Sequence, residues 1–135
     1  MGKKFWISVV VMFVLAMAIG VAVHGMLLSP DYLKLKSLFR PEADAQHYFW
    51  AMLLAHAFIA FAFTWIYFRG LESRPFLGQG IRYGLAVALL TGIPTYLIYY
   101  AVQPLPGDLV VKQIVFDTIG YVVMGVVLAW INRRA

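Results

Sequence analysis

Residues 5–28 read FWISVVVMFVLAMAIGVAVHGMLL, an apolar run that is interrupted only by Ser8 and His24. A helix rises about 1.5 Å per residue, so a run of this length reaches across a hydrocarbon core about 30 Å thick. Lys3 and Lys4 precede the run, as in a secretory signal, but the run extends well beyond the apolar segment of such a signal. The sequence therefore predicts a membrane-spanning helix that is retained in the protein.

Three further runs of similar length follow the first one. The chain is 63% hydrophobic and 13% charged, whereas about a quarter of the residues in a soluble domain are charged. None of the runs alternates strictly between apolar and polar residues, as a strand of a membrane barrel does. We therefore predict one all-α domain covering residues 1–135, with spanning helices at 5–28, 46–69, 81–102 and 109–132.

The connections between these helices predict their arrangement. The second and third connections are short, which favours antiparallel neighbours and an integral membrane four-helix bundle. The longer segment 29–46 begins with Ser29, Pro30 and Asp31, a typical start of a helix. Apolar residues then recur at helical spacing, so we expect a short helix in the outer membrane interface.

The distribution of basic residues predicts the orientation. If the N-terminus is cytoplasmic, that side holds seven basic residues: Lys3, Lys4, Arg69, Arg74, Arg82, Arg133 and Arg134. The other side then holds four: Lys34, Lys36, Arg40 and Lys112. The positive-inside rule places both termini in the cytoplasm. The net charge of +5 is thus explained by topology, and no basic face with interleaved aromatic residues points to nucleic acid.

Small residues mark a packing surface on the third helix. Gly80, Gly84, Ala88 and Gly92 recur every four positions and share one face. Close helix contacts in membranes need such residues, because burying apolar groups gains little in lipid. Gly92 and Pro94 should also kink this helix near its middle, since proline removes a backbone donor.

Polar residues gather in the outer half of the predicted bundle. Asp117 lies eight residues after Leu109, and His56 lies eight residues after Tyr48. Both should therefore lie about 12 Å below the outer boundary, on antiparallel helices. Further candidates near this level are His24, Thr95, Tyr96, Gln113 and Tyr121, whereas the inner half holds almost nothing comparable. We predict that Asp117 hydrogen-bonds to His56 or to a tyrosine of the third helix.

Three interpretations of this cluster remain open. It could be a structural network that fixes the register of the helices, since an unpaired carboxylate in lipid is costly. It could line a small pocket, open to the outer side, that binds a ligand or passes protons. It could also be catalytic, because a His–Asp pair can act as base and orienting group. No convincing nucleophile accompanies the pair, so we assign no catalytic residue.

The sequence predicts no cofactor and no metal site. Haem would need two imidazoles at one depth, and the only candidates, His24 and His56, differ in depth by about 6 Å. The chain has no cysteine, and no His/carboxylate spacing matches a dedicated metal site.

Two short motifs carry a family resemblance. The last helix contains Asp117-Thr118-Ile119-Gly120-Tyr121, followed by Met124-Gly125 and Trp130, and the first helix ends with Gly25-Met-Leu-Leu-Ser-Pro30. Together with the four helices, these motifs resemble small bacterial inner-membrane proteins defined only as a domain of unknown function. An acidic or amide residue precedes Gly-Tyr in the last helix of that family. The chain lacks the family's aromatic pair at the exit of the first helix. The resemblance implies the bacterial inner membrane and no particular activity.

Two functions are therefore expected. The first is a non-enzymatic accessory or structural subunit that packs against another membrane protein or a second copy of itself in the lipid bilayer. Its contact surface would be the ridge from Gly84 to Gly92, if the other helices leave that ridge uncovered. The alternative is a membrane protein that handles a small molecule or protons through the cluster around Asp117 and His56.

Overall fold

The computed structural model of the protein describes residues 1–133, and every regular element in this range is helical. Four segments are long and apolar enough to cross a membrane: Lys3–Leu27, Lys36–Arg69, Phe76–Val102 and Gly107–Ile131. The prediction of an all-helical chain is thus confirmed for residues 1–133, and four helical segments have the length and composition of a membrane span.

The four spans differ in how regular they are. The first consists of α1 (Lys3–Gly20), which continues as the π-helix η1 (Val21–Leu27). The second consists of α3 (Glu42–Ala45), the 3-10 turn η3 (Gln46–Tyr48) and α4 (Phe49–Arg69). The third consists of α5 (Phe76–Leu90) and α6 (Gly92–Val102), and the last is the single helix α7 (Gly107–Ile131).

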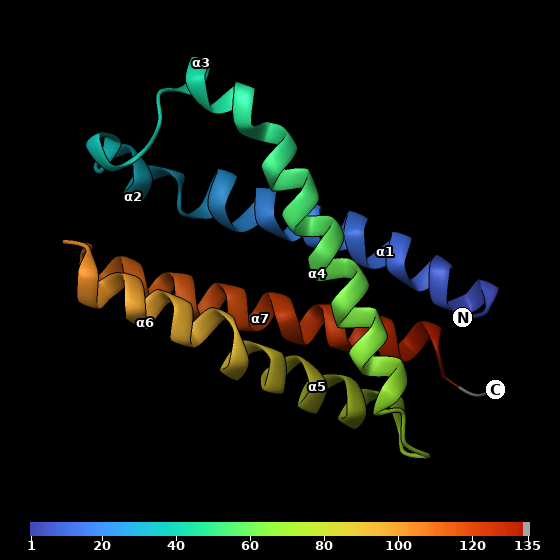
Figure 1. The fold of residues 1–135 in the computed structure, drawn as a ribbon. Helices are drawn as coiled ribbons and strands as arrows, with labels where there is room; N and C mark the ends of the chain where they lie inside the picture. The colour runs from blue at the N-terminus through green and yellow to red at the C-terminus, as the bar shows by residue number, and fades with distance from the viewer. Residues whose placement is uncertain (134–135) are drawn as a thin grey trace.

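The connections gather at two opposite ends of the molecule (Figure 1). The N-terminus, the end of α7 and the loop between α4 and α5 lie at one end, which we name the inner end. The segment around α2 (Ser29–Leu33) and the connection between α6 and α7 lie at the other, which we name the outer end. The names follow the orientation that the basic residues predict.

The α2 segment differs from the single interfacial helix that was expected. It consists of α2 and the separate 3-10 turn η2 (Lys36–Leu38). Ser29 is the first residue of α2 and makes no capping hydrogen bond through its side chain. The reason is that Leu28 is already helical and its carbonyl accepts from the Tyr32 backbone amide at 3.0 Å. The helix therefore continues into α2 without a non-helical residue, and the Tyr32 backbone N–H that a capping Ser29 side chain would bind is already bonded.

The third span is interrupted at Thr91, between α5 and α6. Pro94 lies in the first turn of α6, where its missing N–H is tolerated. Proline cannot donate to the carbonyl of Leu90 four residues earlier, so the regular hydrogen-bond pattern breaks just before it. A break near mid-helix was expected, and the structure places it one residue before Gly92.

The small-residue ridge is covered by α7. Gly80, Gly84 and Ala88 are buried, and a Cβ atom added at Gly84 would lie 2.5 Å from Val122 Cα. The same addition at Gly80 would lie 2.6 Å from Val126 Cα. The backbones of α5 and α7 therefore touch, and the suggestion that this ridge is left free for a partner is wrong.

The core lies mainly toward the inner end, where α1, α4 and α7 meet. It contains the buried residues Met12, Ala16, Ala60, Phe63, Tyr67, Met124, Leu128 and Ala129. The inner half also holds a buried polar contact, because the Asn132 amide donates to Ser8 Oγ at 3.0 Å. This contact joins two uncharged side chains, whereas the predicted outer cluster contains ionisable groups. Ser8 lies at the start of the first span and Asn132 just past the last, so neither stood out as a residue at membrane depth.

The outer half of α4 makes little contact with the other spans. In Figure 1 it crosses α1 and diverges toward the outer end. Between Phe49 and Ile59 every residue is exposed except His56, which is half-buried. His56 is thus the one residue between Phe49 and Ile59 that is partly buried.

Candidate functional site in the outer half

Asp117 links three of the four spans. Its Oδ1 lies 3.1 Å from His24 Nε2 on η1, and its Oδ2 accepts a hydrogen bond from the Tyr96 hydroxyl on α6. Of the partners that the sequence suggested, the structure brings a tyrosine of the third span to Asp117. It does not bring His56 there. The imidazole at Asp117 is that of His24, which had been placed closer to the outer surface.

His24 reaches Asp117 from the π-helix η1. A π-helix is wider than an α-helix and occurs mostly as short insertions, frequently at functional sites. The other ring nitrogen of His24, Nδ1, lies 2.6 Å from the Tyr32 hydroxyl on α2. His24 therefore stands between Asp117 in the span region and Tyr32 at the outer end, with both nitrogens engaged.

Tyr32 extends the network outward and was not among the predicted site residues. Its hydroxyl oxygen accepts a hydrogen bond from Gln113 Nε2 at 3.2 Å. Burial raises the pKa of Tyr32, with a smaller contribution from the Asp117 charge that acts in the same direction. The phenol therefore keeps its proton at neutral pH. The sequence feature that could have identified Tyr32 is its position eight residues after His24, on a short amphipathic helix. That helix had been assigned to the membrane interface instead.

The His24 ring joins Tyr32 to Asp117 through contacts at both of its nitrogens. Nε2 donates to Asp117, because an ionised carboxylate only accepts, and the carboxylate also accepts from the Tyr96 hydroxyl. Nδ1 meets the Tyr32 hydroxyl, which is both a donor and an acceptor. His24, Tyr32, Tyr96 and Asp117 therefore all have partners within the network.

His56 faces the same space without touching Asp117. Its Nδ1 donates to the carbonyl of Met52, one turn earlier on α4, at 2.8 Å. A carbonyl can only accept, so Nδ1 carries the proton and Nε2 of the neutral ring is an acceptor. This Nε2 lies 3.4 Å from the position that a Cβ atom would occupy at Gly20. Gly20 on α1 therefore lies next to the imidazole, and a Cβ atom there would be in van der Waals contact with it.

A cavity of about 220 Å³ separates His56 from Asp117, and we name it the site cavity. It is lined by Ala16, Ile19, Gly20, His24, His56, Ile59, Asp117, Gly120, Tyr121 and Met124. A second cavity of about 610 Å³, the outer cavity, lies under the α2 segment and also has His24 in its wall. His24 is the residue that the two cavities share.

The remaining candidates from the sequence divide into two groups. Gln113 and Tyr121 belong to the site, the first through Tyr32 and the second through the wall of the site cavity. Thr95 does not, because its hydroxyl donates to the Thr91 carbonyl of its own span at 2.6 Å and it is exposed. The structure adds one outer contact, an ion pair of 3.2 Å between Lys112 and Asp31.

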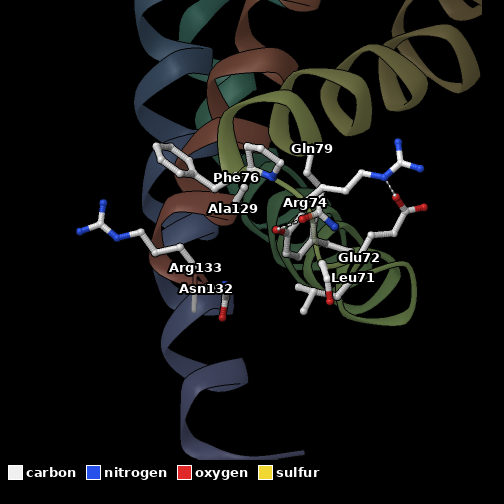
Figure 2. Close-up of a pocket in the computed structure, with 11 residues that line it drawn as sticks. Leu71, Glu72, Arg74, Phe76, Gln79, Ala129, Asn132 and Arg133 are labelled. Atoms are coloured by element: carbon white, nitrogen blue, oxygen red, sulfur yellow. Dashed lines mark hydrogen bonds and ion pairs between the residues drawn. The ribbon is translucent and has the colours of Figure 1, made fainter. Parts of the chain in front are cut away.

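A third cavity, of about 530 Å³, lies at the inner end, next to the start of α5 and the end of α7 (Figure 2). The guanidinium groups of Arg74 and Arg133 in its wall point away from each other, and Arg74 pairs with Glu72 at 2.7 Å. Its two cationic groups therefore do not converge on a common point. The site cavity is smaller but combines a carboxylate with two imidazoles, which makes it the better candidate for a functional site.

No metal centre forms within the described residues 1–133, because no three His, Asp or Glu side chains come together there. Compared with protein-family models, curated proteins and solved structures, the chain matches none. The function has to be inferred from the geometry of the site itself.

Proposed function

We propose that this protein binds a small polar molecule in the outer half of a membrane, in the site cavity between Asp117 and His56. The observation that carries the proposal is a carboxylate held by His24 and Tyr96 from two other spans, beside a cavity that contains a second imidazole. Ionisable groups at membrane depth are costly and usually mark substrate or proton pathways. A network that served only helix packing would not need an adjoining cavity with His56 turned into it.

The accessory-subunit function has less support. Its first candidate contact surface was the ridge from Gly84 to Gly92, and α7 covers Gly84 and Ala88, while Gly92 faces the ring of Tyr121 on α7. The other exposed apolar residues of the spans suit lipid, which covers such surfaces without a protein partner.

Purification from native membranes tests the proposed function. We expect the wild-type protein to release a small molecule on denaturation, and the Asp117→Asn variant to lose most of it. Thr95→Val is the control, since its hydroxyl bonds within its own span. Extracts would be compared by mass spectrometry. A stoichiometric protein partner retained in Asp117→Asn, without any small molecule, would instead support the subunit function.

We also propose an antiparallel bundle in the bacterial inner membrane, with both termini cytoplasmic. The support is the excess of basic residues in the segments assigned to the inner end, together with the position of the N-terminus and the end of α7 there. The chain has no cysteine, so single cysteines report topology directly. An impermeant thiol reagent added outside intact cells should label Gln103→Cys and leave Ser73→Cys unlabelled until the cells are opened. The reverse pattern contradicts the orientation.

A further inference from the structure

The site cavity offers hydrogen-bond acceptors that the protein does not use. A carboxylate has about four acceptor positions, and Asp117 receives donors from His24 and Tyr96 only. His56 Nε2 is a further acceptor, and no group in the described residues 1–133 donates to it. His24 has no free nitrogen to offer, because Tyr32 and Asp117 engage both. A molecule in this cavity therefore meets acceptors at Asp117 and His56.

The charged groups around the site cavity also favour a ligand that donates hydrogen bonds. Neither lysine nor arginine lines the cavity, and Lys112 on the same helix is paired with Asp31. Among the described residues 1–133, the imidazole of His24 is the basic group that lies against Asp117, and it leaves acceptor positions of the carboxylate free. A bound cation that donates hydrogen bonds would fill these positions beside the carboxylate.

The rest of the wall is apolar and aromatic. Ala16, Ile19, Ile59 and Met124 surround the polar groups, and Tyr121 adds a ring that can face a cation. The volume of about 220 Å³ corresponds to roughly seven water molecules at about 30 Å³ each. It is below the usual size of pockets for drug-sized ligands, about 300–1,000 Å³. These walls suit a short hydrocarbon chain next to the charged group.

We infer that the site cavity binds a small primary organic ammonium ion, with the ammonium group between the Asp117 carboxylate and His56 Nε2 and the hydrocarbon part against the apolar wall. This inference rests on the proposed function and specifies its ligand class. A primary ammonium has three N–H donors and no acceptor, which matches the unused acceptors at Asp117 and His56 in a wall without lysine or arginine.

Calorimetric titration of the full-length protein in lipid nanodiscs tests the ligand class with three probes of one chain length. These are n-butylammonium, butan-1-ol and butyrate, at neutral pH. We expect n-butylammonium to bind most tightly and butyrate not to bind. Asp117→Asn, which keeps the shape of the side chain, should weaken n-butylammonium by about tenfold or more, the usual loss for a charged hydrogen bond. His56→Phe should weaken it several-fold.

Matched variants separate the possible outcomes. His47→Phe removes an exposed imidazole outside the cavity and should leave binding unchanged. Gly20→Ala adds a methyl group beside His56 Nε2 at ordinary contact distance and should weaken binding without unfolding α1. Tighter binding of butan-1-ol or butyrate that still depends on Asp117 overturns the ammonium inference and leaves the proposed site standing. Absence of binding by all three probes, or binding that Asp117→Asn does not change, overturns the inference. If the native-membrane extracts also hold no small molecule, the proposed function fails independently.

Discussion

Replacement of Gly84 by alanine is expected to destabilise the protein by about 3 kcal/mol, the upper end of the usual cost of overpacking. The new Cβ would lie 2.5 Å from Val122 Cα and would also clash with the Tyr121 carbonyl. Both are backbone atoms, so no side chain can rotate away and α5 must separate from α7. Reversible unfolding in mixed micelles, followed by circular dichroism, measures the change.

Gly78 provides the control for this prediction, because it lies on the same helix α5 and a Cβ atom there meets nothing within 4 Å. Both replacements raise the helix propensity by up to about 1 kcal/mol. Gly78→Ala should therefore be neutral or slightly stabilising. Equal stability of the two variants would mean that α5 and α7 do not meet along this ridge.

The spans and the close packing of α5 could be predicted because they follow from local sequence. An apolar run of sufficient length defines a span whatever it packs against. Glycine and alanine every four residues define a ridge because that spacing returns to one helix face. The helix that packs against this ridge depends on the tertiary fold and cannot be read from the local sequence. The ridge of Gly80, Gly84 and Ala88 gave no sign that Gly125 on α7 offers an equally bare backbone to it.

The partner of Asp117 was missed for a different reason. Counting residues gives the depth of a side chain in the membrane but not the direction in which it points. His56 matched Asp117 in depth, yet its imidazole is held by the Met52 carbonyl. His24 was placed from the geometry of a regular α-helix, whereas residues 21–27 form a π-helix with a different rise and rotation per residue. His24 lies within this π-helix and contacts Asp117, and no residue pattern in the first run indicates the change from α-helix to π-helix.

Removal of the Asp117 carboxylate, which Tyr96 contacts, is the second change that we expect to lower the stability strongly. Asp117→Ala should destabilise the protein by about 2 kcal/mol, because the donors of His24 and Tyr96 both lose their acceptor. Single interhelical polar contacts in membranes average about 0.6 kcal/mol and reach about 1.7 kcal/mol. Because Asp117→Ala removes two such contacts at once, a loss of about 2 kcal/mol is expected. Tyr96→Phe should remove about 1 kcal/mol, measured by the same reversible unfolding.

A double-mutant cycle distinguishes this contact from general damage to the site. If Tyr96 donates to Asp117, then Tyr96→Phe should cost less in the Asp117→Ala background, with a coupling of about 1 kcal/mol. Thr95→Val, one residue away, removes a hydroxyl that bonds within its own span and should show no coupling to Asp117→Ala. Additive effects of Tyr96→Phe and Asp117→Ala would mean that the two side chains do not interact. Asp117 would then lack one of the two donors that hold it beside the cavity, and the assignment of its unused acceptor positions would have to change with it.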